Sequence, residues 1–236
     1  MTATTVELSA SQLTALHQLS SPALPVGGYS YSQGLEAAVE LGLVTDEASA
    51  QAWIGAQLRH VVTDGDAPLW CLLHTAWLTT DASALRHWNQ WFLSSREAGE
   101  LRHETLQMGA SLLRLGRELG WFDQARLQLL AAVPQPTLPL LHSMACAALD
   151  LPQLAGLSSY LYSWLENQTT AALKSVPLGQ VAAQRILHQL RQQLPPVLDE
   201  ARRRSQATPP QLQTLAPQYA IVASRHAHQF SRLFRS

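Results

Sequence analysis

The side chains in this chain best suited to metal chemistry are a few histidines and carboxylates. Glu100 and His103 have the Glu-x-x-His spacing that di-iron helical bundles use, and Glu104 follows directly. Such sites need two copies of the motif, and the sequence holds one. His226 and His228 lie two residues apart, which places them on different faces of a helix. A helical metal-binding enzyme is therefore kept as an alternative, and we expect no tightly bound metal or other cofactor.

The motifs of two common enzyme classes are missing. A P-loop NTPase needs Gly-x-x-x-x-Gly-Lys-Ser/Thr, so that the lysine reaches the nucleotide phosphates. The single lysine, Lys174, precedes Ser175 but has no glycine at the required position upstream. The run that begins at Gly28 and includes Ser30 lacks the second glycine of a Gly-x-Ser-x-Gly nucleophile elbow. We therefore predict that the chain is not a P-loop GTPase and has no nucleophile elbow.

A run rich in proline, glycine and tyrosine, from Pro22 to Glu36, is the most distinctive part of the sequence. Pro25 fixes its own φ, and the Gly27-Gly28 pair allows positive φ and a close backbone approach. Ser30 and Gln33 have the spacing of a capping box, which predicts that a helix starts at Ser30. A stiff loop would then present two tyrosines and a serine at the N-terminus of this helix.

The rest of the chain has helical periodicity. Apolar residues recur at i, i+3 and i+4 nearly throughout, and period-two runs are essentially missing. We predict an all-α fold: a single layered helical domain over residues 1–236, with about ten helices and no significant sheet. The N-terminus (about 1–8) and a C-terminal tail (about 224–236) are expected to be flexible. The stretch from Asp64 to Pro68 is expected to separate the third helix from the fourth.

Composition indicates a cytoplasmic protein with partners. Charged residues make up 14% of the chain, against about 25% in typical soluble domains, so part of the surface is expected to be covered in a homo-oligomer or complex. Cys71 and Cys146 lie in apolar surroundings and are read as core thiols of a reducing compartment. Neither a signal peptide nor a membrane span is expected. Six arginines and no acidic residue follow Glu200, so a nucleic-acid-binding arm is a second alternative.

Three stretches, in this order, resemble the UreF family of urease accessory proteins: Leu19–Glu36, Glu166–Gln180 and Ser231–Ser236. The resemblance implies a helical, non-enzymatic, homodimeric assembly factor. It would bridge the GTPase UreG and the scaffold UreD (also called UreH) on apo-urease, and couple GTP hydrolysis to nickel insertion into the urease active site. Nickel would be handled by the complex without stable binding to this chain, and neither nucleic acid nor a membrane would be a partner.

Glu166, Thr170 and Lys174 form a stripe on one expected helix, with Lys174 in its last turn, where the helix dipole favours a cation. An ordinary exposed lysine would have the same pattern, whereas the resemblance implies a surface that meets the GTPase. The residues expected on the GTPase side are Pro25, Gly27, Gly28, Tyr29, Ser30, Tyr31, Ser32, Gly34, Glu36, Glu166, Thr170 and Lys174. Those expected on the scaffold side are Phe230, Ser231, Arg232, Leu233, Phe234, Arg235 and Ser236.

Overall fold

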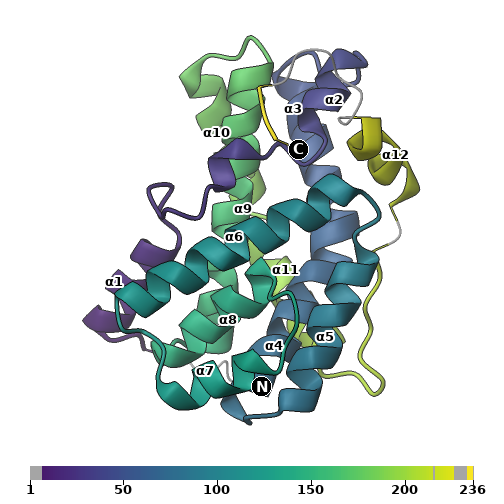
Figure 1. Ribbon diagram of the computed structural model, residues 1–236. Helices are drawn as coiled ribbons and strands as arrows, with labels where there is room; N and C mark the ends of the chain where they lie inside the picture. Colours follow the sequence, from purple (N-terminus) through teal and green to yellow (C-terminus); the bar gives the residue numbers. More distant parts are fainter. Residues whose placement is uncertain (1–6, 215, 226–232, 236) are drawn as a thin grey trace.

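A computed structural model describes residues 7–214, 216–225 and 233–235, and in these residues it contains helices and no strand (Figure 1). The all-α prediction is confirmed. The α-helices are α1 (Ala10–Leu19), α2 (Leu35–Glu40), α3 (Glu47–Gln57), α4 (Ala67–Leu78), α5 (Ala82–Ser95), α6 (Gly99–Glu118), α7 (Gln124–Ala131), α8 (Leu138–Ala148), α9 (Gln153–Ser175), α10 (Gln180–Arg191), α11 (Leu194–Ser205) and α12 (Pro217–Arg225). Two further elements are η1 (Gly28–Ser30), a 3-10 helix, and η2 (Leu58–Asp66), a π-helix.

The longest helix, α9, is shared by two hydrophobic clusters. Its first half contributes Leu157 and Leu161 to a large cluster with α4, α8 and α11, and α6 packs against α8 on the other side. Its second half contributes Leu165, Ala172 and other residues to a smaller cluster with α2, α3 and α10. In Figure 1, α9 therefore runs the length of the molecule, from the end near α1 to the end near α10. The C-terminal end of α9 therefore belongs to the same helix that packs in the larger cluster.

The predicted break between Asp64 and Pro68 is wrong. The chain continues from α3 through η2 into α4, and the amide of Ala67 donates to the carbonyl of Val62, five residues back. Pro68 lies in the first turn of α4, where its missing N–H is tolerated. Gly65 is needed here, because a Cβ on it would lie 2.4 Å from Thr214 Cγ2. The segment that precedes α12, which includes Gln213 and Thr214, thus packs directly on the π-helix η2.

None of the helices in the described ranges is both long and apolar enough to cross a membrane. Both cysteines are free and buried, and burial raises the pKa of Cys71 to about 12. These thiols are inert parts of the core, as the sequence predicted.

Two buried histidines flank Trp70 in the larger cluster. The ring of His74 stacks on Trp70 with 5.2 Å between centroids, and Trp70 Nε1 donates to His142 Nδ1 at 3.3 Å. Burial lowers the pKa of His74 to about 4 and that of His142 to about 3. Both imidazoles are therefore neutral near pH 7, and protonating either one opposes folding.

We expect the stability of the protein to fall between pH 7 and pH 5. An unfolded histidine titrates near pH 6.5, so between about pH 6.5 and pH 4 the unfolded chain binds more protons than the folded one. Each buried imidazole should then remove about 2 kcal/mol of unfolding free energy by pH 5. The variant His74→Phe keeps a ring against Trp70 and should lose about half of this pH dependence in urea unfolding at the two pH values.

Replacing the exposed His103 by Gln provides the control, because it should leave the wild-type pH dependence intact. A His74→Phe protein with the full wild-type loss of stability would show that the buried imidazole is not responsible.

Candidate functional site

The loop between α1 and α2 has a different course from the predicted one. Helix α2 begins at Leu35 with Gly34 as its N-cap, so the capping box between Ser30 and Gln33 is wrong. Gln33 (φ 50°) and Gly34 (φ 82°) are consecutive left-handed residues, and a right-handed helix cannot run through them. Ser32 does help at the helix start, because its Oγ accepts from the amide of Glu36 at 3.4 Å.

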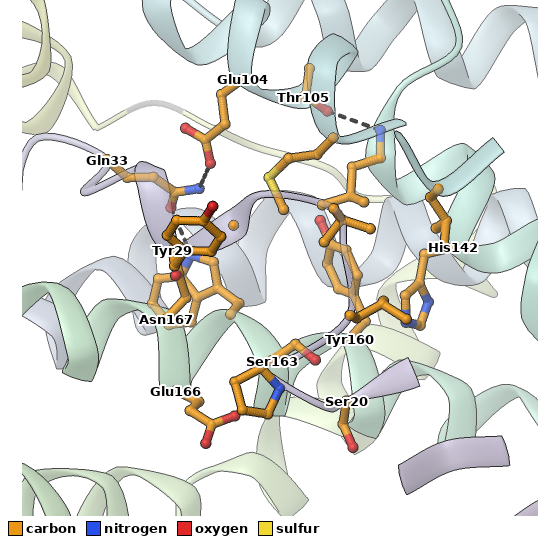
Figure 2. A pocket seen from close by; sticks show the side chains of 18 of the residues that line it. Ser20, Tyr29, Gln33, Glu104, Thr105, His142, Tyr160, Ser163, Glu166 and Asn167 are labelled. Carbon is orange, nitrogen blue, oxygen red and sulfur yellow. Dashed lines mark hydrogen bonds between the residues drawn. The ribbon is translucent and has the colours of Figure 1, made fainter. Parts of the chain in front are cut away.

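The side chain of Gln33 attaches this loop to two helices (Figure 2). Its Nε2 donates to Glu104 Oε1 of α6 at 2.6 Å, and its Oε1 accepts from Trp164 Nε1 of α9 at 2.8 Å. Asn167 Nδ2, also on α9, donates to the carbonyl of Tyr31 at 3.1 Å. Sequence reasoning missed this role for Gln33 and considered Glu104 only as a metal ligand. In the sequence, this role was indicated only by a glutamine that directly precedes a glycine in an expected turn.

Lys174 lies in the last turn of α9, as predicted, and two aromatic rings flank it. Its Nζ is 5.7 Å from the centroid of Tyr29 and 5.6 Å from that of Phe234, both within cation–π range. Within the described part of the chain Lys174 forms no ion pair. The three segments that the sequence singled out, far apart along the chain, therefore meet at this ammonium group.

The C-terminal tail is held on the loop mainly through its backbone. The amides of Leu233 and Phe234 donate to the carboxylate of Glu36 at 2.6 and 3.2 Å, and the amide of Arg235 donates to the carbonyl of Ser30 at 2.7 Å. In Figure 1 this end of the chain lies beside the loop, between α10 and α2. Phe234 is 5% exposed and is covered by its own chain, whereas Leu233 is 70% exposed.

The tail and the loop, predicted to serve two different partners, thus form one continuous surface. The remaining tail positions assigned to the scaffold side lie outside the described residues: Phe230, Ser231, Arg232 and Ser236.

A cavity of about 160 Å³ lies under the loop, between α6, α8 and α9 (Figure 2). Its inner wall contains buried polar residues, among them Asp66, Arg96, Glu104 and His142. Its outer rim is more exposed and is formed by Pro22 and the α9 residues Ser163, Glu166, Asn167 and Thr170. Two of the residues predicted for the GTPase side, Glu166 and Thr170, therefore line a cavity, next to the loop that covers it.

Asp66 and Arg96 form a buried ion pair at the inner wall. The Arg96 guanidinium also lies over the ring of Phe92, 4.1 Å from its centroid. Burial lowers the pKa of Arg96, but the charge and hydrogen bond of Asp66 raise it further, so the guanidinium stays protonated. Because Asp66 ends η2 and Arg96 is the residue directly after α5, the pair fixes the ends of these two elements against each other.

The residues proposed for a metal site are not brought together. Glu104 is buried at the cavity, whereas His103 points to solvent. Over residues 7–214, 216–225 and 233–235, no group of three or more His, Cys, Asp or Glu side chains could hold a metal ion. His226 and His228 lie outside these residues.

The arginines after Glu200 do not form a free cationic arm in the described part of the chain. Arg203 and Arg204 both pair with Glu200, and Arg204 also reaches Asp64 at 2.7 Å. Arg202 pairs with Asp199 at 3.2 Å. These three charges are compensated within α11 and by η2, whereas Arg225 and Arg235 form no ion pair in the described part of the chain. The compensation weakens the nucleic-acid alternative, because a smaller positive charge is left for phosphates.

Comparison with known proteins finds one family. The UreF family model matches residues 44–191. The chain is 61% identical over 218 residues to the urease accessory protein UreF of Bordetella parapertussis, covering 92% of this chain and 99% of that protein. It is 51% identical over 225 residues to UreF of Cupriavidus taiwanensis, covering 95% and 98%. It is also 60% identical over 232 residues to the bifunctional urease accessory protein UreEF of Bordetella bronchiseptica, covering 98% of this chain and 54% of that longer protein.

The variant Gln33→Ala should destabilise the loop measurably. It removes the donor to Glu104 and the acceptor for Trp164, and it leaves a non-glycine residue at positive φ, so we expect a loss of about 2 kcal/mol in urea unfolding. The variant Gln33→Gly relieves the backbone but removes the same two bonds, and should recover only part of this loss. Replacing the exposed Gln107 of α6 by Ala should change little. Full recovery by Gln33→Gly would show that the side-chain bonds contribute nothing.

Proposed function

Because this chain belongs to the UreF family of urease accessory proteins, we propose that it is a non-catalytic assembly factor that bridges UreG and UreD/UreH on apo-urease. In this role it couples GTP hydrolysis by UreG to nickel insertion into the urease active site. It works as a homodimer, and nickel is handled by the complex without stable binding to this chain.

The observation that carries this proposal is the convergence of the loop, the end of α9 and the tail at Lys174. Tyr29, one of the two rings beside this cation, is 63% exposed, and Leu233, which precedes the other ring in sequence, is 70% exposed. An exposed tyrosine ring is among the side chains that contribute most to protein–protein binding. An acidic side chain of the GTPase would find here a cation already oriented by two rings.

The work of such a factor is differential binding. To gate the release of nickel, the complex must hold one nucleotide state of the GTPase more tightly than the other. A surface on α9 is suited to this task, because α9 is packed into both hydrophobic clusters and cannot adjust to a partner that changes shape. It therefore binds one shape of the partner more tightly than the other. We therefore expect replacement of Lys174 to change the affinity for the partner and to leave the stability of the free chain unchanged.

We predict that Lys174→Ala weakens capture of UreG by about tenfold or more, because it removes the cation that lies beside Tyr29 and Phe234. The measurement is the dissociation constant for purified UreG with and without nucleotide. Arg117→Ala is a matched control, since Arg117 is also an exposed cation in the last turn of a helix. Both variants should unfold at the wild-type temperature. Undiminished UreG binding by Lys174→Ala would make it an ordinary surface lysine.

Removal of Leu233–Ser236 tests the tail. We expect weaker capture of UreD/UreH, because the exposed Leu233 is lost, and also weaker capture of UreG, because one ring beside Lys174 is lost. Leu13→Ala removes a comparably exposed aliphatic side chain from α1 and serves as the control. A truncated chain that forms the complex as well as the full-length one would exclude a docking role for the tail.

A further inference from the structure

Glu166 is a carboxylate in an unusual position. It is half-buried on the outer rim of the cavity, and the described residues offer it no hydrogen-bond or ion-pair partner. Desolvation raises the pKa of Glu166, which shows that its surroundings oppose the charge. An unpaired acid at the opening of a cavity indicates a cationic ligand.

The cavity behind Glu166 suits a ligand with an apolar stem. Pro22 and Leu24 of the loop and Leu138 of α8 line its wall with aliphatic surface. In Figure 2, Ser20 and Ser163 lie on the same side as Glu166, whereas Glu104 and Thr105 lie on the opposite side. A carboxylate at the rim, followed by aliphatic walls, matches a positively charged head on a chain of methylene groups.

A bare metal ion fits this position less well. Divalent cations take several oxygen or nitrogen ligands at once, and among the described residues that line the cavity Glu166 is the only carboxylate without a partner. Glu104, across the cavity, is already bonded to Gln33. The absence of a three-ligand group holds for the described residues around the whole cavity.

We propose that the rim of this cavity receives an arginine side chain of the partner protein, with the guanidinium on Glu166 and the methylene stem against Pro22 and Leu24. Arginine is favoured over lysine because its guanidinium is more weakly hydrated and can bind a carboxylate with two parallel hydrogen bonds. The proposal rests on the proposed function, and it names what the GTPase side of this chain recognises: a cation at Glu166, next to the site for an anion at Lys174.

The test uses the purified full chain and n-butylguanidinium, which carries the same head and stem. The reporter is the indole N–H of Trp164, which lines the cavity, observed by NMR and assigned with the variant Trp164→Phe. Wild-type protein should show saturable shifts, and Glu166→Gln should bind about tenfold more weakly, as expected for loss of a charged hydrogen-bonded pair. The neutral isostere n-butylurea should bind the wild type about tenfold more weakly as well.

Two controls separate this role from a structural one. Glu118→Gln removes an exposed carboxylate on α6 and should leave the affinity for n-butylguanidinium unchanged. Glu166→Gln should unfold at a temperature no lower than that of the wild type, because it removes an unpaired, desolvated charge. Equal binding of the guanidinium and the urea, equal affinity of wild type and Glu166→Gln, or no saturable shift at all would each overturn the proposal. No GTPase is present in this test, so its failure leaves the proposed function standing.

Discussion

The amide side chain of Gln33 attaches the loop between α1 and α2 to two helices. Gln33 accepts from Trp164 and donates to Glu104, and these two partners lie on helices that belong to the main core. The positive φ of Gln33 and Gly34 turns the chain so that this amide points inward and α2 starts two residues later. Tyr29 is thereby placed over Lys174, the cavity gains its cover, and the carboxylate of Glu36 faces the tail. Loss of this one attachment would affect all three features together.

Buried charged side chains gather around the cavity and the loop that covers it. The cluster around Trp70 is almost entirely apolar, and its two histidines are neutral. By contrast, the ion pair of Asp66 with Arg96, the carboxylate of Glu104 and the rim carboxylate Glu166 all border one cavity. Each of these groups is expensive to bury, and apolar residues of similar size would pack there with less loss of stability. Such local conflict with stability is expected where a surface must recognise something charged.

The sequence predicted those features that depend on local patterns. Helical periodicity and the absence of alternating runs were sufficient for the all-α fold, and the position of Lys174 before Pro177 placed it in the last turn of α9. The errors arose where distant residues decide the local conformation. Gly65 and Pro68 look like a helix break, but the packing of Thr214 on Gly65 keeps the chain in a π-helical turn. Ser30 and Gln33 look like a capping box, but Gln33 is bonded to α6 and α9. The cavity could not be predicted, because its walls come from segments that share no motif.

The same contacts connect the tail to the surface around Lys174. Phe234 provides one of the two rings beside this ammonium, and Glu36, which opens α2, binds the amides that hold Phe234 in place. A protein that draws the tail away therefore leaves Lys174 with one ring and frees the Glu36 carboxylate from two amide donors. By linkage, a partner that binds the Lys174 surface more tightly when Phe234 is in place must also stabilise the bound position of the tail. The free energy by which the tail favours this partner equals the free energy by which the partner favours the tail. Two partners that contact the loop and the tail would thus influence each other through this chain without any larger rearrangement of its helices.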